Sequence, residues 1–460
     1  MSAKKSFPKN AADFWLNLLI CALLGALLAQ CAVFLAHFVK SGKSDGEIPF
    51  EMQMLSTSTR DSRLNIDAGL FQPSLIAVSS EGKSSAVLNS AEVVREVYAD
   101  ISPCLFDALQ NEPVAVSDAR WNEAAVGENY VYVQYPAEFP YQVVFAYAAA
   151  AAESDAQIRR AGTYIGVREA LLLPDESGKI SLVFVRGNDG SYVFAYQADT
   201  SMDVFSVYPE AYPDVFYPGV VNLVDGRAEF SVTEKIAARD IYVSEIGVSA
   251  LLSNRSHLEA LFRLLNYNPD KLRYHTETDG TFVYVESHGV LRMDARSIQY
   301  SATEQGGIPL SRIVGRGATG DIYSYLRAAS HIVWRLSDMD PLYTGGDAGL
   351  LLRSVTTSEG AVSLHFGFCS DNVEIYRSDR NTGLTVTFKN DKIVDVSLHM
   401  TIVRRSANFH RLMLQSWCRE YLAPGVPAAL RPVYRMEESA ISMSAEWLVE
   451  VLHGEEEDGQ

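Results

Sequence analysis

Residues 257–303 read HLEALFRLLNYNPDKLRYHTETDGTFVYVESHGVLRMDARSIQYSAT. The first part has apolar residues three and four positions apart, which places them on one face of a helix. Asn268-Pro269 is expected to end that helix. The apolar face consists of Leu258, Leu261, Phe262 and Leu265. Three runs rich in β-branched and aromatic residues follow at short intervals: 281–286, 290–293 and 297–301. The stretch therefore predicts a helix that packs against an antiparallel meander.

The same plan recurs on both sides of this stretch. Ser90 is expected to cap a helix with Val93, Val94, Val97 and Ile101 on its apolar face. A further helix is marked by Ile322, Tyr325, Leu326, Ala329, Val333 and Leu336. Strands are predicted at 130–135, 142–147, 180–186, 192–196, 350–356, 361–368, 384–389 and 393–404. The connections between strands are too short for parallel crossovers, so the predicted fold class is α+β with antiparallel sheets.

The N-terminal part of the chain has a long uncharged run. No residue from 14 to 39 carries a formal charge, and this length exceeds the roughly 20 apolar residues that cross a bilayer as a helix. A cleaved signal peptide has a shorter apolar core of about 7–15 residues. We therefore predict an uncleaved signal anchor, a single transmembrane helix, at 14–39.

Basic residues around the anchor predict its orientation. Lys4, Lys5 and Lys9 precede the run, whereas Lys40 and Lys43 follow it beside acidic residues. Because cytoplasmic flanks are enriched in Lys and Arg, we expect the N-terminus in the cytoplasm and the bulk of the chain outside it. The predicted localisation is the cell membrane, with one span.

Four small residues share one face of the anchor: Ala22, Gly25, Ala26 and Ala29. Small residues let membrane helices approach closely, so this set is a candidate helix-packing contact with another span. The alternative is that these residues face lipid and contact no partner.

The composition argues against several classes of site. The 460-residue chain has a formal net charge of −18, whereas nucleic-acid-binding surfaces are basic. No His or Cys pair has zinc-ligand spacing, and no serine-nucleophile motif occurs. His257, His331 and His410 are placed on predicted helices as surface or half-buried residues. We predict no catalytic residue, no metal site and no cofactor.

Residues 315–320 read GRGATG and fit the GxGxxG pattern of a nucleotide-binding loop. A dinucleotide site also needs a parallel strand on each side of the following helix, and the strands predicted downstream form hairpins. We therefore interpret the motif as a turn into a helix capped by Thr319 or Asp321.

Aromatic residues and prolines accompany each other in the first predicted block. They are Tyr135, Tyr141, Tyr147, Tyr208, Tyr212, Phe216 and Tyr217, with Pro136, Pro140, Pro209, Pro213 and Pro218. Such residues suit a protein-contact surface, and they equally suit ordinary edge strands and loops.

The stretch 257–303 resembles the helix-then-strands signature of the YycH regulatory proteins. The family pattern is a Leu/Phe helix, Asp-Gly-Thr with a following Tyr, Leu-x-Ile and then Ile-x-Tyr. The matching residues here are Asp279, Gly280, Thr281, Tyr284, Leu291, Met293, Ile298 and Tyr300, with Met293 in place of the usual Ile or Leu. The sequence LRPVY at 430–434, followed by WLV at 447–449, resembles the closing strands of YycH and the related YycI proteins.

The resemblance implies a function without catalysis. Members of this family regulate an essential membrane sensor histidine kinase that controls cell-wall metabolism, so the implied partners are such a kinase and a paralogous single-pass regulator. An exported envelope protein that binds or modifies a cell-wall polymer or peptide is the alternative from another class.

The block pattern and the resemblance together predict seven segments. They are a cytoplasmic N-terminus (1–13), the anchor (14–39), a tether (40–67), a first extracytoplasmic α+β domain (68–250), a central YycH-like α+β domain (251–310), a C-terminal YycI-like α+β domain (311–454) and an acidic tail (455–460).

The predicted topology can be tested by cysteine accessibility in a background without native cysteines. A cysteine introduced as Ser44→Cys should react with a membrane-impermeant maleimide on intact cells, because the tether is expected outside. A cysteine introduced as Ala3→Cys should react only after lysis. Labelling of position 3 on intact cells would reverse the topology.

Overall fold

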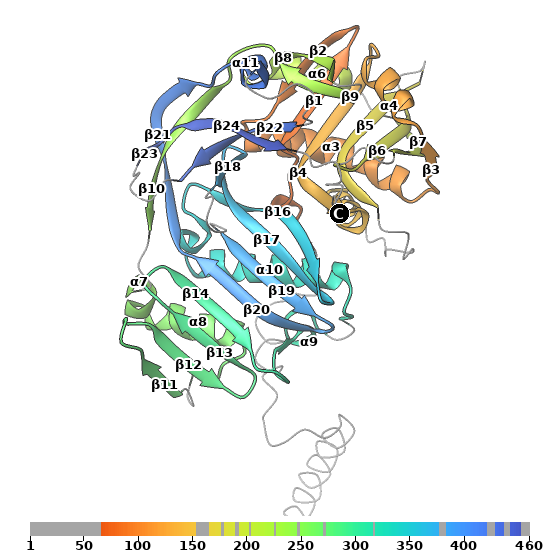
Figure 1. The fold of residues 1–460 in the computed structure, drawn as a ribbon. Helices are drawn as coiled ribbons and strands as arrows, with labels where there is room; N and C mark the ends of the chain where they lie inside the picture. The colour runs from red at the N-terminus through yellow and green to blue at the C-terminus, as the bar shows by residue number, and fades with distance from the viewer. Residues whose placement is uncertain are drawn as a thin grey trace, which may run out of the picture. The chain divides into compact units, whose positions relative to one another are not determined.

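The chain is described from a computed structural model (Figure 1). The described residues are 66–152, 165–175, 179–188, 193–201, 204–224, 227–245, 249–269, 273–315, 318–376, 383–420, 428–436 and 442–451. Leu64–Gln460 forms one compact unit. The predicted N-terminal segment, the anchor, most of the tether and the acidic tail lie outside the described residues, and the predicted domain boundaries remain predictions.

The first sheet combines nine strands of the described chain in the order β3-β7-β6-β5-β4-β1-β2-β8-β9. All neighbouring pairs are antiparallel. Its strands are β1 (Leu75–Ser80), β2 (Lys83–Val87), β3 (Val114–Val116), β4 (Tyr130–Pro140), β5 (Gly166–Pro174), β6 (Lys179–Arg186), β7 (Val193–Ser201), β8 (Tyr217–Val224) and β9 (Arg227–Val232). The helical elements of this region are η1 (Ala68–Leu70), α3 (Ala91–Leu109), α4 (Asp118–Ala125), α5 (Tyr141–Ala151) and α6 (Val204–Ala211).

Helix α3 confirms the predicted cap and apolar face. The Ser90 side chain accepts a hydrogen bond from the Val93 N–H, and the predicted apolar residues are all buried. The helix contacts β7 and α5. Its cap and its burial pattern are both local sequence signals, which is why the prediction held.

The strand predicted at 142–147 is wrong, because these residues belong to α5. All seven residues of 143–149 are buried, so the period-2 alternation of a half-buried strand is missing. The run of alanines that closes the helix has the highest helix propensity. Contacts with α3 and α10 cover the helix, and they outweigh the β preference of Val143 and Val144.

The second sheet contains the stretch 257–303. Twelve strands of the described residues form it, and β14 pairs antiparallel with β20, so the two lie side by side in Figure 1. Its strands are β11 (Arg273–Thr276), β12 (Phe282–Glu286), β13 (Gly289–Met293), β14 (Ser297–Ala302), β15 (Ile308–Pro309), β16 (Gly349–Ser358), β17 (Ala361–Ser370), β18 (Val373–Tyr376), β19 (Leu384–Lys389), β20 (Lys392–His399), β22 (Ala428–Arg435) and β24 (Ala445–Val451). Its accompanying helical elements are α7 (Ser249–Ser253), α8 (Arg255–Leu264), α9 (Leu310–Val314), α10 (Ile322–Met339) and η2 (Pro341–Thr344).

The strand predicted at 393–404 is divided in two. Strand β20 ends at His399, and β21 (Thr401–Arg411) enters a separate sheet with β10 (Ala237–Glu245) and β23 (Ser442–Met443). The chain leaves one sheet for the other at Met400, whose N–H bonds to the Arg296 carbonyl. After the sheet, helix α11 (Gln415–Glu420) begins.

The two sequences that resemble closing strands are both strands and pair with each other. Strands β22 and β24 are antiparallel, with Leu430 opposite Val449 and Pro432 opposite Trp447. Strand β18 runs parallel to β22, an exception to the predicted antiparallel sheets. The described chain is α+β, with sheets that are mainly antiparallel.

Helix α8 packs its predicted apolar face on the meander. Leu261, Phe262 and Leu265 are buried, and Leu258 packs partly buried against the same core. The Phe262 ring meets the Tyr284 ring edge-on at 4.8 Å. This contact connects the helix to the middle of the four-strand meander.

Substitution Phe262→Ala should lower the unfolding free energy of the full-length chain by about 3–5 kcal/mol, because a buried ring leaves a cavity. Arg263→Ala should cost less than about 1 kcal/mol, because its side chain is exposed and makes only a surface ion pair with Glu259. Chemical denaturation measures both values, and equal small losses would contradict the packing of α8.

Candidate functional site

The predicted helix-packing residues Ala22, Gly25, Ala26 and Ala29 lie outside the described residues. Among the helices that the structure does describe, none is both long and apolar enough to cross a membrane. The membrane span and the helix-packing contact therefore stay predictions.

Of the glycine motif 315–320, the structure describes Gly315 and residues 318–320, which lead into α10. Gly315 has a φ of 86°, which favours glycine, and a Cβ on Gly320 would lie 2.4 Å from the Asn390 carbonyl oxygen. The Asp321 side chain accepts a hydrogen bond from the Ser324 N–H and caps α10. The strands before and after this helix, β15 and β16, have antiparallel partners in the described chain, so the parallel frame of a dinucleotide site is missing there.

The aromatic and proline set does not gather into a surface. Tyr135 and Tyr147 are completely buried and pack around Phe71, whose ring stacks on Tyr147 at 4.5 Å. Tyr208 and Phe216 are also buried. The described aromatic residues of this set therefore belong mainly to the core, which neither the contact-surface interpretation nor the edge-strand and loop interpretation predicted.

A buried ion cluster crosses the first sheet. Arg186 of β6 and Glu169 of β5 form an ion pair with almost no exposed side-chain surface. Arg227 lies 3.4 Å from the same carboxylate, and the Tyr132 hydroxyl donates to its other oxygen at 2.7 Å. The Arg186 guanidinium also stacks over the Trp121 ring at 4.4 Å. Adjacent strands are thus held together by charge as well as by backbone bonds.

The two arginines determine the charge state of this carboxylate. Burial by itself raises the pKa of Glu169, but Arg186 and Arg227 outweigh burial and lower that pKa from 4.5 to about 2. Burial and the Glu169 charge raise the pKa of Tyr132 well above its ordinary value. Glu169 is therefore ionised and Tyr132 is neutral near pH 7, a pairing that stabilises the fold and leaves no base available for proton transfer.

A second cluster joins β16, β18 and β22. Glu374 of β18 pairs with Arg353 at 3.1 Å and with Arg431 of β22. Burial raises the pKa of Glu374, but the two guanidinium groups outweigh burial and the pKa is lowered. Nearby, Asp371 lies 3.0 Å from Arg405 and 3.8 Å from Arg239. Each carboxylate thus has two arginine partners.

His410 lies near an aspartate and a serine, as in a catalytic triad, but the serine hydroxyl does not contact the histidine ring. The ring lies between Asp240 at 2.9 Å and the Ala445 carbonyl at 2.7 Å. The Ser444 hydroxyl donates to Asp240 rather than to the ring. A serine nucleophile needs the histidine as its base, so this set instead connects β10, β21 and the start of β24. The prediction of a helix at His410 is wrong, since the residue lies in β21.

Among the described residues, Cys369 is buried and Cys418 is partly buried, and neither forms a disulfide. Burial raises the pKa of Cys369 to about 12, which leaves very little reactive thiolate near neutral pH. Within the described ranges, no cluster of three or more His, Cys, Asp or Glu has the geometry to hold a metal ion.

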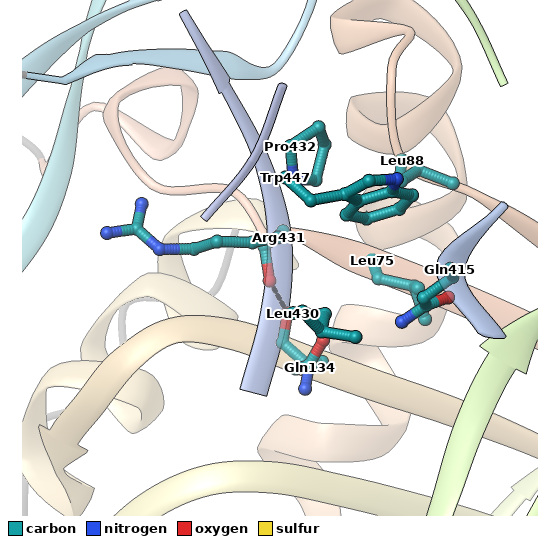
Figure 2. Close-up of a pocket in the computed structure, with 9 residues that line it drawn as sticks. Leu75, Leu88, Gln134, Gln415, Leu430, Arg431, Pro432 and Trp447 are labelled. Atoms are coloured by element: carbon teal, nitrogen blue, oxygen red, sulfur yellow. Dashed lines mark hydrogen bonds between the residues drawn. The ribbon is translucent and has the colours of Figure 1, made fainter. Parts of the chain in front are cut away.

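A small hollow lies where the closing strands meet the first sheet (Figure 2). Its volume is about 10 Å³, close to the space that one water molecule requires. Trp447 and Pro432 lie above Leu75, Leu88 lies beside the Trp447 ring, and the Arg431 side chain extends away from the hollow (Figure 2). A sugar ring or a peptide side chain is too large for this space, so the hollow marks a packing seam.

The ion clusters were missed in the sequence, although a signal was present. Glu169, Arg353 and Glu374 each interrupt an apolar strand, and a charge in such a strand indicates a buried partner. The partner itself could not be named, because Arg186 and Arg431 come from other strands.

Comparison with known proteins adds the fold relationship. No family model matches the sequence, and no curated protein matches it either. The crystal structure of YycH from Bacillus subtilis superposes with a TM-score of 0.52, covering 84% of this chain and 94% of that one at 11% identity. The chain has a YycH-like fold. At this identity the likeness concerns the fold alone, and the YycH-like architecture extends beyond 257–303 to most of the chain.

The pKa of Glu169 predicts a pH-dependent stability. Because the folded-state pKa is below the unfolded-state value, the ionised carboxylate stabilises the fold above about pH 4.5, and this contribution is lost as the pH falls toward 2. Glu169→Gln should destabilise the chain by about 3–5 kcal/mol at pH 7, because a buried arginine loses its partner. The difference from wild type should shrink between pH 4.5 and the lowest pH at which both fold.

A matched control is Glu259→Gln, which removes the surface ion pairs with Arg255 and Arg263. Exposed pairs contribute at most about 1 kcal/mol. Denaturation curves at several pH values that showed equal losses for both variants would mean that Glu169 does not hold the first sheet.

Proposed function

We propose that this chain is a membrane-anchored, non-enzymatic regulator that binds a sensor histidine kinase of a cell-envelope two-component system and modulates its activity. The observation that carries the proposal is the YycH-like fold, which covers 84% of this chain and 94% of YycH. The resemblance of 257–303 and of the closing strands to the YycH and YycI families supports it from the sequence.

The chemistry of the described residues supports a scaffold. Glu169 and Glu374 are each held by two arginines, and His410 ties strands together. Groups in such pairs fix the positions of strands, as a scaffold requires. The exterior therefore suits recognition of a partner by its surface.

The proposal places the chain in the cell membrane with one span, a cytoplasmic N-terminus and an exterior bulk. The anchor would contact the spans of the kinase, and of a paralogous single-pass regulator, through Ala22, Gly25, Ala26 and Ala29. The contacts that transmit regulation are proposed for the bilayer and the exterior.

Co-purification from crosslinked membranes tests the proposal. The tagged full-length chain should recover one membrane sensor kinase, and autophosphorylation of that kinase should change when the chain is deleted. Gly25→Ile and Ala29→Ile should reduce the recovery, because larger side chains prevent close helix packing.

Cys31→Ile is the matched control. At about 100° per residue, position 31 lies about 180° from Ala22 and about 160° from Ala29, away from the small-residue face, so this small-to-large change should leave recovery unaltered. Normal membrane insertion of all three variants is verified by alkaline extraction. If no membrane kinase is recovered with the wild-type chain, the proposal is wrong.

A further inference from the structure

An exposed apolar strip runs from the end of β21 into α11. Phe409, Met413 and Trp417 expose 58%, 48% and 48% of their surface, although each is a large apolar side chain. Arg411 is exposed between them. We call these four residues, with Lys235 and Arg239, the aromatic–cationic strip.

Arg239 joins the strip from β10, and Lys235 joins it from the connection between β9 and β10. Arg239 lies opposite Phe409 in the β10–β21 pair, with its guanidinium 4.7 Å from the ring centre. The Lys235 ammonium is 5.7 Å from the centre of the Trp417 ring. Both cations therefore lie beside exposed rings, and the strip is continuous across two segments distant in sequence.

The backbone beneath the strip is firmly held. Leu412 is buried and its N–H bonds to the Ile236 carbonyl at 2.9 Å. The Trp447 indole N–H donates to the Met413 carbonyl at 2.7 Å, and the Gln415 side chain accepts from the Val232 N–H at 2.9 Å. A rigid base presents the exposed side chains without an ordering cost on binding.

The charge of the strip is opposite to that of the chain. The full sequence carries a formal net charge of −18, whereas the strip contributes Lys235, Arg239 and Arg411. Asp371 is shared between Arg239 and Arg405 and neutralises only one of them. The exposed Glu234 next to Lys235 is the one acidic side chain among the described residues 227–239 that is exposed.

We infer that the aromatic–cationic strip binds an acidic segment of a partner protein that also carries apolar side chains. The cations supply charge complementarity for carboxylates, and Trp417, Met413 and Phe409 supply apolar area. Trp, Met and Arg are the types enriched in protein interfaces. An anionic polymer with a sugar or polyol backbone would use the cations but gain little from three large apolar groups.

This inference rests on the proposed function for the identity of the partner, since the segment is expected in the exterior part of the kinase or of the paralogous regulator. The binding chemistry itself does not depend on that identity, which allows the two to be tested separately.

The first test uses the purified full-length chain and a synthetic peptide of alternating Glu and Leu. Fluorescence anisotropy of the labelled peptide should show saturable binding. Trp417→Ala and Phe409→Ala should each weaken it at least ~10-fold, as expected for central interface residues. Lys235→Glu should weaken it as strongly by reversing the charge.

Trp334→Ala and Arg335→Glu are matched controls. Trp334 in α10 is also 48% exposed and also has a cation over its ring, Arg335 at 4.8 Å. These variants should bind the peptide within about twofold of wild type. Equal losses of peptide affinity in Trp417→Ala and Trp334→Ala would overturn the inference. It would also be overturned if poly(glycerol phosphate) bound as tightly as the peptide and its affinity were unchanged by Trp417→Ala.

The second test uses crosslinked membranes. Trp417→Ala should reduce recovery of the kinase or the paralogous regulator, while Trp334→Ala should not. If Trp417→Ala recovers as much of the partner as the wild type, the inference is wrong and the proposed function is unaffected. If the wild-type chain recovers no membrane partner but the peptide binds through Trp417, the proposed function fails and the strip stands as a binding surface for acidic segments.

Discussion

The antiparallel pairing of β10 with β21 is the constraint on which the described architecture depends. Strand β10 follows β9 of the first sheet, and β21 follows β20 of the second, so this pair connects the two large sheets. Ile241 and Val243 alternate with exposed neighbours and are buried. A shift of one residue would expose both and bury Tyr242, so the core determines the register.

Buried ion pairs help to specify the order of the strands, which backbone hydrogen bonds alone do not determine. Glu169 joins β5 to β6, and Glu374 joins β16, β18 and β22. Burying these charged groups costs desolvation free energy, and burying one of them without its partner costs more. A strand that paired in a wrong order would therefore bury an unpaired guanidinium, and the native strand order avoids this penalty.

Local signals were read correctly from the sequence and non-local ones were not. The caps Ser90 and Asp321, and the apolar face of α8, depend on neighbours within a few positions. Residues 142–147 form a helix rather than a strand because helices distant in sequence bury them. Strand β20 ends where the chain turns to pair with β10. Neither contact is visible in the local spacing of apolar residues. The strip around Trp417 was missed because Lys235 and Arg239 come from a segment distant in sequence. The anchor residues around Gly25 are not described, so that candidate contact remains a prediction.

The separation of paired strands also has a consequence for biosynthesis. Asp240 and His410, which meet across β10 and β21, are 170 residues apart in sequence. Strand β10 is therefore synthesised long before β21. Until β21 has been made, the apolar residues Ile241 and Val243 lack their native packing. Contacts between residues so far apart in sequence slow folding and prolong the lifetime of aggregation-prone intermediates. The β10–β21 pair can therefore form only after residues 401–411 have been synthesised.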